Sequence, residues 1–240
     1  MRRLLTIVTV LLLTLLLGGM ECGFEEDEPD LVFDFDLNTD LQGWVGGFTD
    51  YPVDLTDWPD FELTWGHEPL PSNLGSGSGL YISGKNYSDD LFMFIKRRVT
   101  GLGANTTYRL RFKIKVATNA PSECGGIGGP PGEAVYLKAG AVLVEPVPAD
   151  SDGYYQLNID KGNQAAGGAD AIVLGHIGNS NTDCIHPVYE IKTLDSGSKE
   201  FELTTDSEGS AWIIVGTDSG FEGQTSLYYN QVKTSFSRNL

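Results

Sequence analysis

Aromatic residues and aspartates alternate between residues 44 and 67 of this 240-residue chain. The aspartates of this segment are Asp50, Asp54, Asp57 and Asp60. Sugar rings stack their C–H faces on flat aromatic side chains, and neighbouring carboxylates accept hydrogen bonds from hydroxyl groups. The segment therefore predicts contacts with a carbohydrate, made by Trp44, Tyr51, Trp58 and Trp65. The alternative is that these rings pack a long loop over one face of the protein, because tryptophans are usually buried.

Oxygen-bearing side chains occupy every second position of an earlier run, which comprises Asp34, Asp36, Asn38 and Asp40. Alternate positions of a strand share one face, so the run could present several oxygen ligands to a divalent cation. An EF-hand is excluded, because Thr39 stands where its glycine is needed and Val45 where its bidentate acid is needed. The alternative is a solvated strand face followed by turn-forming residues.

No stretch of the sequence matches a catalytic signature. Residues 125–132 are rich in glycine but lack the spacing of a dinucleotide-binding loop. A glycan hydrolase needs two carboxylates about 5 to 10 Å apart. The acids near predicted strand ends are Asp89, Asp90, Glu133 and Glu222, and the sequence selects no pair among them. The polar loop of residues 160–170 could present side chains to a ligand or only turn the chain.

The first 22 residues have the layout of a bacterial export signal. Two arginines precede an apolar run of residues 4–17, which is shorter than the roughly 20 residues that span a bilayer. The layout resembles a lipoprotein signal with Cys22 as the lipidated residue, although Glu21 departs from the small residue that usually precedes this cysteine. We expect an exported protein, located in the periplasm, at the cell surface or secreted. A lipid anchor on Cys22 is the one membrane contact that the sequence suggests.

The chain is strongly acidic. Without the two arginines and one glutamate of the signal, the 16 basic and 33 acidic residues become 14 and 32, a net charge of −18. Such a chain is repelled by phosphate backbones, so nucleic acid is excluded as a partner. Residues 23–30 are acidic and unpatterned, which is typical of a solvated tether. The sequence does not indicate an oligomeric state.

Two cysteines remain after the signal, Cys124 and Cys184, and an exported protein is expected to pair them. A disulfide between them would stabilise the fold by roughly 4 kcal/mol in the chain-entropy model. A catalytic cysteine is the weaker interpretation, because nothing in the local sequence marks His67, His176 or His186 as a base.

Apolar and charged residues alternate from Tyr108 to Val116, which predicts a half-buried strand. The apolar run of residues 91–99 and the turn at residues 100–106 predict an antiparallel hairpin with it. Further strands are predicted at residues 31–37, 61–65, 80–83, 134–144, 154–159, 188–194, 200–204, 212–217 and 226–236. These short strands, separated by turns and without a helical period, predict an all-β fold. We expect a single antiparallel jelly-roll-type β-sandwich over residues 31–240.

The predicted hairpin would gather half of the basic charge that remains after the signal: Lys96, Arg97, Arg98, Arg109, Arg111, Lys113 and Lys115. Two interpretations are open. Acidic strands such as residues 200–202 could neutralise this charge, or the basic residues could bind an anionic ligand.

The two ends of the predicted domain carry a resemblance to a known fold. Phe33-Asp-Phe-Asp36 followed by Leu41-Gln-Gly-Trp44 resembles the first strand and turn of galactose-binding-like jelly rolls, the fold of many carbohydrate-binding modules. The closing residues 226–233 are similar to their last strand, which commonly returns beside the first. The whole chain resembles a group of bacterial exported proteins without a settled activity. By analogy with such modules, structural calcium is expected near the first and last strands, with Asp36, Asp40 and Asp218 as its ligands.

Three functions follow in descending order. The first is an exported, non-catalytic protein that binds a carbohydrate. The second is a structural or adhesive module of the cell envelope. The third is a secreted glycan hydrolase or lyase, for which no catalytic residue is predicted.

Overall fold

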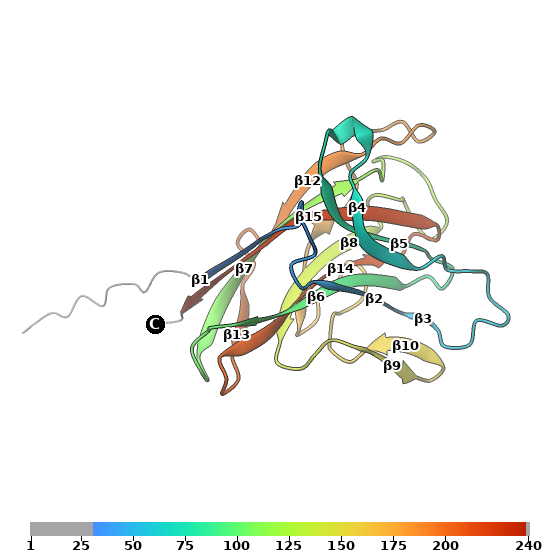
Figure 1. Cartoon of the computed structure of the whole chain (residues 1–240). Coiled ribbons are helices and arrows are strands. Elements are labelled where there is room, and N and C mark those ends of the chain that lie inside the picture. Colours follow the sequence, from blue (N-terminus) through green and yellow to red (C-terminus); the bar gives the residue numbers. More distant parts are fainter. Residues whose placement is uncertain (1–30, 239–240) are drawn as a thin grey trace, which may run out of the picture.

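The computed structural model describes residues 31–238, whose regular elements are strands apart from one short 3-10 helix (Figure 1). The strands form two large antiparallel sheets and a small third sheet, so the predicted all-β sandwich is confirmed. The predicted signal at residues 1–22, with Cys22, and the predicted tether at residues 23–30 lie outside the described residues.

One layer is a seven-stranded sheet built around its two longest strands, β7 (Thr107–Thr118) and β15 (Gln224–Arg238). Its other strands are β1 (Leu31–Asp36), β4 (Thr64–Pro69), β5 (Ser78–Lys85), β12 (Glu190–Asp195) and β13 (Phe201–Thr204). A 3-10 helix, η1 (Ser72–Leu74), joins β4 to β5. The first strand lies antiparallel to the last, with Phe35 opposite Val232. The expectation that the last strand returns beside the first is therefore confirmed.

The second layer is a five-stranded sheet in the order β11-β8-β14-β6-β2. Its strands are β2 (Val45–Thr49), β6 (Leu91–Thr100), β8 (Val135–Val142), β11 (Ala171–His176) and β14 (Ser210–Ser219). The small sheet consists of β3 (Tyr51–Pro52), β9 (Pro148–Ser151) and β10 (Tyr154–Leu157). In Figure 1 the small sheet lies below the five-stranded sheet.

The core between the two large sheets follows from alternating sequence patterns. In β7, Leu110, Phe112, Ile114 and Val116 are each at most 1% exposed, and they pack into the main hydrophobic cluster. Burying each such side chain stabilises the fold by about 1.5–3 kcal/mol. The charged residues between them point to the outer face of the seven-stranded sheet.

The predicted hairpin between residues 91–99 and 108–116 is wrong. Strand β6 pairs with β2 and β14, whereas β7 pairs with β12, β13 and β15 in the other sheet. The turn between the two strands therefore crosses from one layer to the other. As a result, the basic residues of β6 and those of β7 lie on different sheets.

Strand β6 is buried on both of its faces. Met93 and Ile95 point into the core between the sheets, while Phe92 and Phe94 point outward. The outward rings join a second cluster with Ile214 of β14, and Leu157 and Ile159 from the small sheet and the loop after it pack against it. The small sheet and this loop therefore form a cover over the five-stranded sheet.

Four strands lie outside the ranges that the sequence predicts: β2, β3, β9 and β11. They are short, and β2 and β11 contain glycine, which weakens the alternating pattern. The predicted disulfide between Cys124 and Cys184 is present. Within residues 31–238, no helix has the length and apolar character needed to cross a membrane.

Candidate functional site

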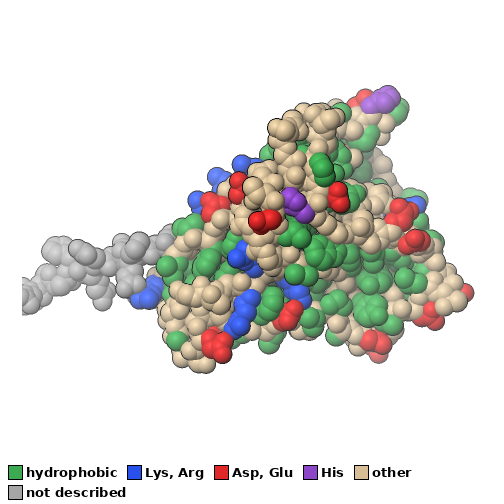
Figure 2. Space-filling view, in the orientation of Figure 1, with side chains coloured by type: hydrophobic (Ala, Val, Ile, Leu, Met, Phe, Trp, Pro, Cys, Tyr) green, Lys and Arg blue, Asp and Glu red, His purple; other side chains and the backbone are tan. Residues whose placement is uncertain are grey.

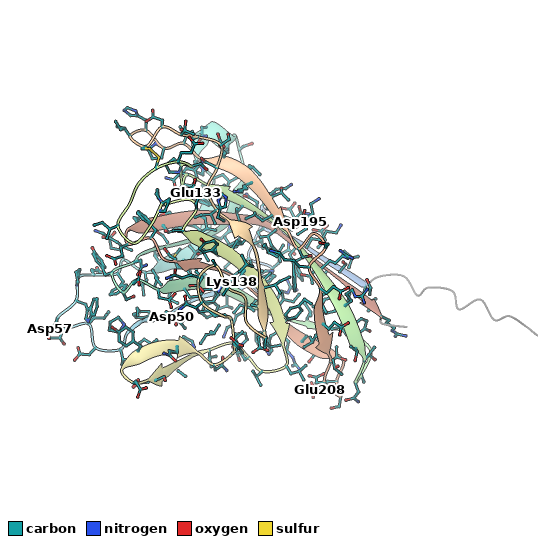
Figure 3. All side chains as sticks on the ribbon, turned by 180° about the vertical axis from the view of Figure 1, so that it is seen from behind. Asp50, Asp57, Glu133, Lys138, Asp195 and Glu208 are labelled. Carbon is teal, nitrogen blue, oxygen red and sulfur yellow. A yellow bond between two sulfur atoms is a disulfide. The ribbon has the colours of Figure 1, made fainter. Side chains whose placement is uncertain are left out.

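Five charged side chains from distant parts of the chain converge on the outer face of the five-stranded sheet. Lys138 lies in β8 and Asp218 near the end of β14, the neighbouring strand. Asp90 directly precedes β6, Asp50 stands between β2 and β3, and Lys161 follows β10. We call these five residues the carboxylate–lysine network. Figure 3 shows Lys138 in the middle of the sheet and Asp50 toward the small sheet.

Lys138 is buried and fully hydrogen-bonded. Its side chain is 1% exposed, and its ammonium donates to Asp218 Oδ2 at 2.7 Å. It also donates to the carbonyl oxygens of Lys161 at 3.0 Å and Ala166 at 2.9 Å. An ammonium has three hydrogens, so each has an acceptor. This explains why a charge is tolerated here, because a buried charge without partners costs several kcal/mol.

Lys161 ties the loop after β10 to the same carboxylates. Its ammonium lies 2.9 Å from Asp218 Oδ2 and 2.9 Å from Asp50 Oδ2. The contact with Asp50 is an ion pair by distance, outside the angles of a hydrogen bond. The backbone N–H of Gln164 donates to the same Asp218 oxygen at 3.0 Å. Asp218 thereby holds this loop against the sheet.

Asp90 carries a proton at neutral pH. Two buried oxygens, Asp90 Oδ1 and Asp218 Oδ1, have no donor among the charged and amide groups of residues 31–238. Burial, together with a hydrogen bond to Asp218 and the negative charge of that residue, raises the pKa of Asp90 to about 8. The carboxyl proton of Asp90 is then the donor that Asp218 Oδ1 lacks.

The remaining groups of the network are charged. Burial would raise the pKa of Asp218, but Lys161, the proton of Asp90 and Lys138 outweigh it and lower this pKa. At Asp50 burial dominates over the attraction of Lys161 and raises the pKa. Burial lowers the pKa of Lys138. At Lys161 burial acts in the same direction, but the negative charges of Asp218 and Asp50 help to outweigh it and the pKa is raised. With Asp90 protonated, two ammonium groups balance two carboxylates, and the network is electrically neutral.

The three aspartates of the network could hold a metal such as calcium, because one oxygen from each lies within 4.8 Å of the others. However, the ammonium groups of Lys138 and Lys161 already lie against two of these carboxylates. A divalent cation would bring the positive charge to four against three carboxylates. The charge count therefore favours a proton at Asp90 over a metal ion.

A hollow of about 180 Å³ opens beside the network, and we call it the polar pocket. Its wall consists of Asp50, Asp90, Gln156, Leu157, Ile159, Asp160, Lys161, Gly162 and Asn163. Among residues 31–238, no protein group hydrogen-bonds to the side-chain amides of Gln156 and Asn163. The predicted polar loop after β10 thus does line a pocket, with two amides available to a ligand.

The predicted carbohydrate-contacting residues fall into three environments. Trp44 is 1% exposed and packs edge-on against Phe35, so its ring belongs to the core. Tyr51 and Trp58 both contact Phe61, with ring centroids 5.7 and 6.1 Å apart, and Trp58 is 36% exposed. Trp65 lies on edge strand β4 and is 37% exposed.

A close approach of two strands fixes the position of Trp65. Its ring covers Gly46 of β2, where a Cβ atom would come within 2.5 Å of the ring. The glycine is therefore required for this contact between the edges of the two sheets. Trp65 and Trp58 are not in ring contact with one another, so the structure does not join the predicted aromatic residues into one platform.

The residues expected to bind calcium do not come together. Asp36 Oδ1 accepts hydrogen bonds from the backbone and side chain of Asn38, and Asp40 Oδ1 accepts one from the backbone of Gln42. Both aspartates are exposed and belong to the turn after β1. Asp218 lies in the other sheet, within the carboxylate–lysine network. A calcium site that joins these three aspartates stays a prediction without geometric support.

A larger hollow of about 300 Å³ lies beside the disulfide of Cys124 and Cys184. None of the residues that line it carries a charge. It therefore offers fewer strong hydrogen-bonding groups to a polar ligand than the polar pocket does.

Comparisons with known proteins find distant structural similarities and no sequence family. No protein-family model and no curated protein matches the sequence. A mannan-recognising carbohydrate-binding module is 10% identical, with a TM-score of 0.40 over 88% of this chain and 100% of the module. The xylan-binding CBM22-1 domain of Paenibacillus barcinonensis Xyn10C is 11% identical, with a TM-score of 0.37 over 88% of this chain and 95% of that domain.

An adhesin domain of Lys-gingipain from Porphyromonas gingivalis W83 is 11% identical, with a TM-score of 0.33 over 89% of this chain and all (100%) of that domain. Each of these three matches is a distant similarity with a TM-score of 0.40 or less, and the β-sandwich of this chain is shown by its own strand pairing.

Proposed function

We propose that this chain is an exported, non-catalytic protein whose polar pocket binds one sugar unit of a carbohydrate. The observation that carries the proposal is the wall of this pocket, where carboxylates lie beside the side-chain amides of Gln156 and Asn163, which make no hydrogen bond to any protein group within residues 31–238. Hydroxyl groups both donate and accept hydrogen bonds, so a sugar can donate to the carboxylates of this wall and can both donate to and accept from its amides.

The hydrogen-bonding groups of the pocket fit a neutral, hydroxyl-rich ligand. Lys161 is already engaged by Asp50 and Asp218, so it has little capacity left to bind an anion. Asp50 and Asp160 provide acceptors for hydroxyl donors, and Gln156 and Asn163 provide both donors and acceptors. An anionic sugar would meet two carboxylates without a free cation, so we expect a neutral one.

The size of the pocket limits the ligand. Its volume of about 180 Å³ is below the range of about 300–1,000 Å³ that is common for drug-sized ligands. A single sugar ring, or the end of a chain, is therefore the appropriate size. Tyr51 pairs with Tyr155 directly across the small sheet, and both residues adjoin pocket residues in sequence. Trp58 and Tyr51 are proposed to flank a longer ligand.

Glycan hydrolysis is the second candidate, and the proton on Asp90 favours it. A carboxyl group with a pKa of about 8 can act as a general acid at neutral pH. Hydrolysis also needs a free carboxylate as nucleophile or base. Two other carboxylates line the pocket: Asp50 is paired with Lys161 at 2.9 Å, and Asp160 accepts hydrogen bonds from the backbone N–H groups of Gly162 and Ala169. Binding without catalysis is therefore the better-supported function.

Export is part of the same proposal. The signal-like first 22 residues predict it, and the disulfide of Cys124 and Cys184 is typical of proteins outside the reducing cytoplasm. Periplasmic, surface-attached and secreted forms remain alternatives, with Cys22 as the proposed lipid acceptor. The mass of the mature chain would distinguish a lipid-anchored form from one that is only cleaved, because lipidation adds acyl chains to Cys22.

A glycan array tests the binding function directly. The purified protein is expected to give a signal for a neutral glycan, and Gln156→Ala or Asn163→Ala is expected to weaken that affinity about tenfold, through lost hydrogen bonds. Asn38→Ala removes an exposed amide from the turn after β1 and serves as the control. A blank array contradicts the proposal and favours an envelope module, as does a signal that both pocket variants retain.

A further inference from the structure

The outer face of the seven-stranded sheet carries a row of charged side chains on its central strands. Because side chains alternate along a strand, the core residues of β7 leave Arg109, Arg111, Lys113 and Lys115 on the outside. Lys233 of β15 stands directly opposite Lys113 on this same face. In Figure 2, lysine and arginine side chains gather along the upper-left margin, above β1 and β7.

Three of these cations line one groove of about 270 Å³: Arg111, Lys113 and Lys233. The only carboxylate in its wall is Asp195, whose Oδ1 accepts the backbone N–H of Gly197 at 2.9 Å. The wall therefore carries three positive charges against one negative charge. In a chain with a formal net charge of −17, this is a local reversal of sign.

The cations of the groove are poorly neutralised by the protein itself. Lys233 lies 3.6 Å from Asp34, and both side chains are more than 40% exposed, so this ion pair is weak. Arg111 donates one hydrogen bond, to the carbonyl oxygen of Gly197 at 2.7 Å, which leaves most of its guanidinium available. Within residues 31–238, Lys113 makes no ion pair.

The pairing of Lys113 with Lys233 works against stability. Like charges that face one another on neighbouring strands repel, and here they occupy directly opposed positions of β7 and β15. Asp195 of β12 stands opposite Lys113 on its other side and Asp34 of β1 stands opposite Lys233, so part of this repulsion is offset. Such an arrangement is common at sites that bind a ligand of opposite charge, because stability and binding place different demands on the same residues.

Tyrosine rings lie farther along the same face. Tyr228 of β15 contacts Tyr81 of β5 and Tyr189, with ring centroids 4.9 and 5.6 Å apart, and all three rings are partly exposed. Tyr228 and Lys233 are five positions apart, and the β-bulge between Tyr229 and Gln231 brings both side chains to the same face, at most about 16 Å from one another. The face therefore presents an aromatic group and a cationic groove along one line, far enough apart for more than one sugar unit.

We propose that the outer face of the seven-stranded sheet binds an acidic polysaccharide. Its carboxylate or sulfate groups contact Arg111, Lys113 and Lys233 in the groove, and a neighbouring sugar ring stacks on the tyrosines around Tyr228. This site is separate from the polar pocket, which lies on the other sheet. The overall negative charge of the protein repels polyanions, so binding of one requires a local cationic site.

Titration of the purified protein with three polymers tests the proposal: polygalacturonate, dextran sulfate and uncharged dextran. We expect binding to at least one of the two polyanions, weaker at higher salt, and none to dextran. Binding of polygalacturonate alone identifies carboxylates as the recognised groups, and binding of dextran sulfate alone identifies sulfates. Binding of neither polyanion overturns the proposal.

The double variant Lys113→Gln/Lys233→Gln is expected to lose at least about tenfold in affinity for the bound polyanion, because two charge-assisted contacts are removed. Arg98→Gln removes one charge from β6, on the other sheet, and should bind as the unmodified chain does. Unchanged binding by the double variant overturns the proposal.

Thermal unfolding of the same variants separates binding from folding. The double variant should melt close to the temperature of the unmodified protein, because the repulsion that it loses is offset by the loss of the exposed contacts with Asp34 and Asp195. If it fails to fold, Arg111→Gln provides the binding test instead. Gln156→Ala should leave polyanion binding unchanged, so failure at the polar pocket and failure at this groove give different results.

Discussion

The outer faces of the two large sheets each carry a lysine, but the two lysines differ in burial and in the partners of their ammonium groups. On the five-stranded sheet, Lys138 is 1% exposed and its ammonium has three acceptors. On the seven-stranded sheet, Lys113 is exposed, makes no ion pair within residues 31–238 and faces another lysine. The first lysine is covered by the small sheet and the loop after β10, whereas the second lies on open strand surface.

The difference shows that charge alone does not indicate a binding site. A buried lysine is tolerated when neighbouring groups satisfy it, and removing it then leaves its partners unpaired. An exposed lysine next to a like charge contributes nothing to stability, so its position is explained better by a ligand. Substitutions on the two faces should therefore change stability in opposite directions.

The largest effect is expected from Lys138→Met. This change leaves Asp218 buried with one ammonium partner fewer and should lower the free energy of unfolding by roughly 3–5 kcal/mol, measured by urea denaturation. Arg98→Met breaks an exposed ion pair with Glu208 and should cost about 0–1 kcal/mol as the control. Equal losses in both variants would contradict the structural role of the network.

The second effect concerns pH. The pKa of Asp90 is raised to about 8 in the folded protein, above its value in the unfolded chain. The folded state therefore binds more protons, and the stabilisation from this group is lost as pH rises toward and through 8. We expect the urea midpoint to fall between pH 7 and 9. Burial also raises the pKa of Asp50, which therefore acts in the same direction.

Asp90→Asn isolates this contribution, because the amide donates a hydrogen bond to Asp218 and carries no proton to lose. The fall in the urea midpoint between pH 7 and 9 should be smaller in this variant, whereas titrations elsewhere in the protein are unchanged. An identical pH dependence in both proteins would show that Asp90 does not hold the proton assigned to it.

The smallest effect has the opposite sign. Lys113→Gln removes the repulsion with Lys233 together with the weaker attraction of Asp195, which stands opposite on β12 without forming an ion pair. It should therefore raise the free energy of unfolding by about 0.2–0.5 kcal/mol. The same substitution at the covered lysine, Lys138→Gln, should destabilise the protein, since a neutral amide cannot replace the ammonium between Asp218 and two carbonyl groups. Destabilisation by Lys113→Gln would remove the contrast between the two faces.

The sequence predicted those elements whose environment is visible in local patterns. Strand β7 has one buried and one exposed face, so its alternation identifies the buried residues correctly. The pairing of the first strand with the last followed from a resemblance of both ends to one fold. The disulfide followed from there being two cysteines left after the signal.

The hairpin prediction failed because β6 is covered on both faces. Residues 91–95 are all apolar, which does not distinguish a strand in one sheet from a strand in the other. Lys138 was missed for a related reason. It alternates with core residues of β8, so the pattern places it toward water, and only the loop around Lys161 and Ala166, more than 20 residues later, covers it.

The candidate site could be anticipated only in fragments. Asp90 and the polar loop of residues 160–170 stood out as polar groups near strand ends. They form one pocket only because the folded chain brings together three segments that are distant in sequence, around Asp50, Asp90 and residues 156–163. The aromatic segment did carry exposed rings at Trp58 and Trp65, and the sequence could not show that Trp44 is part of the core. Long-range packing decides these outcomes, and a single sequence contains little information about it.

Hydrogen–deuterium exchange with a neutral glycan selected from the array tests the central claim most directly. Binding in the polar pocket should slow exchange in β10 and in the loop of residues 158–164, which carry Gln156, Asp160 and Asn163. Slowed exchange confined to residues 53–65, around Trp58 and Trp65, would contradict the pocket and place the carbohydrate on the aromatic segment instead.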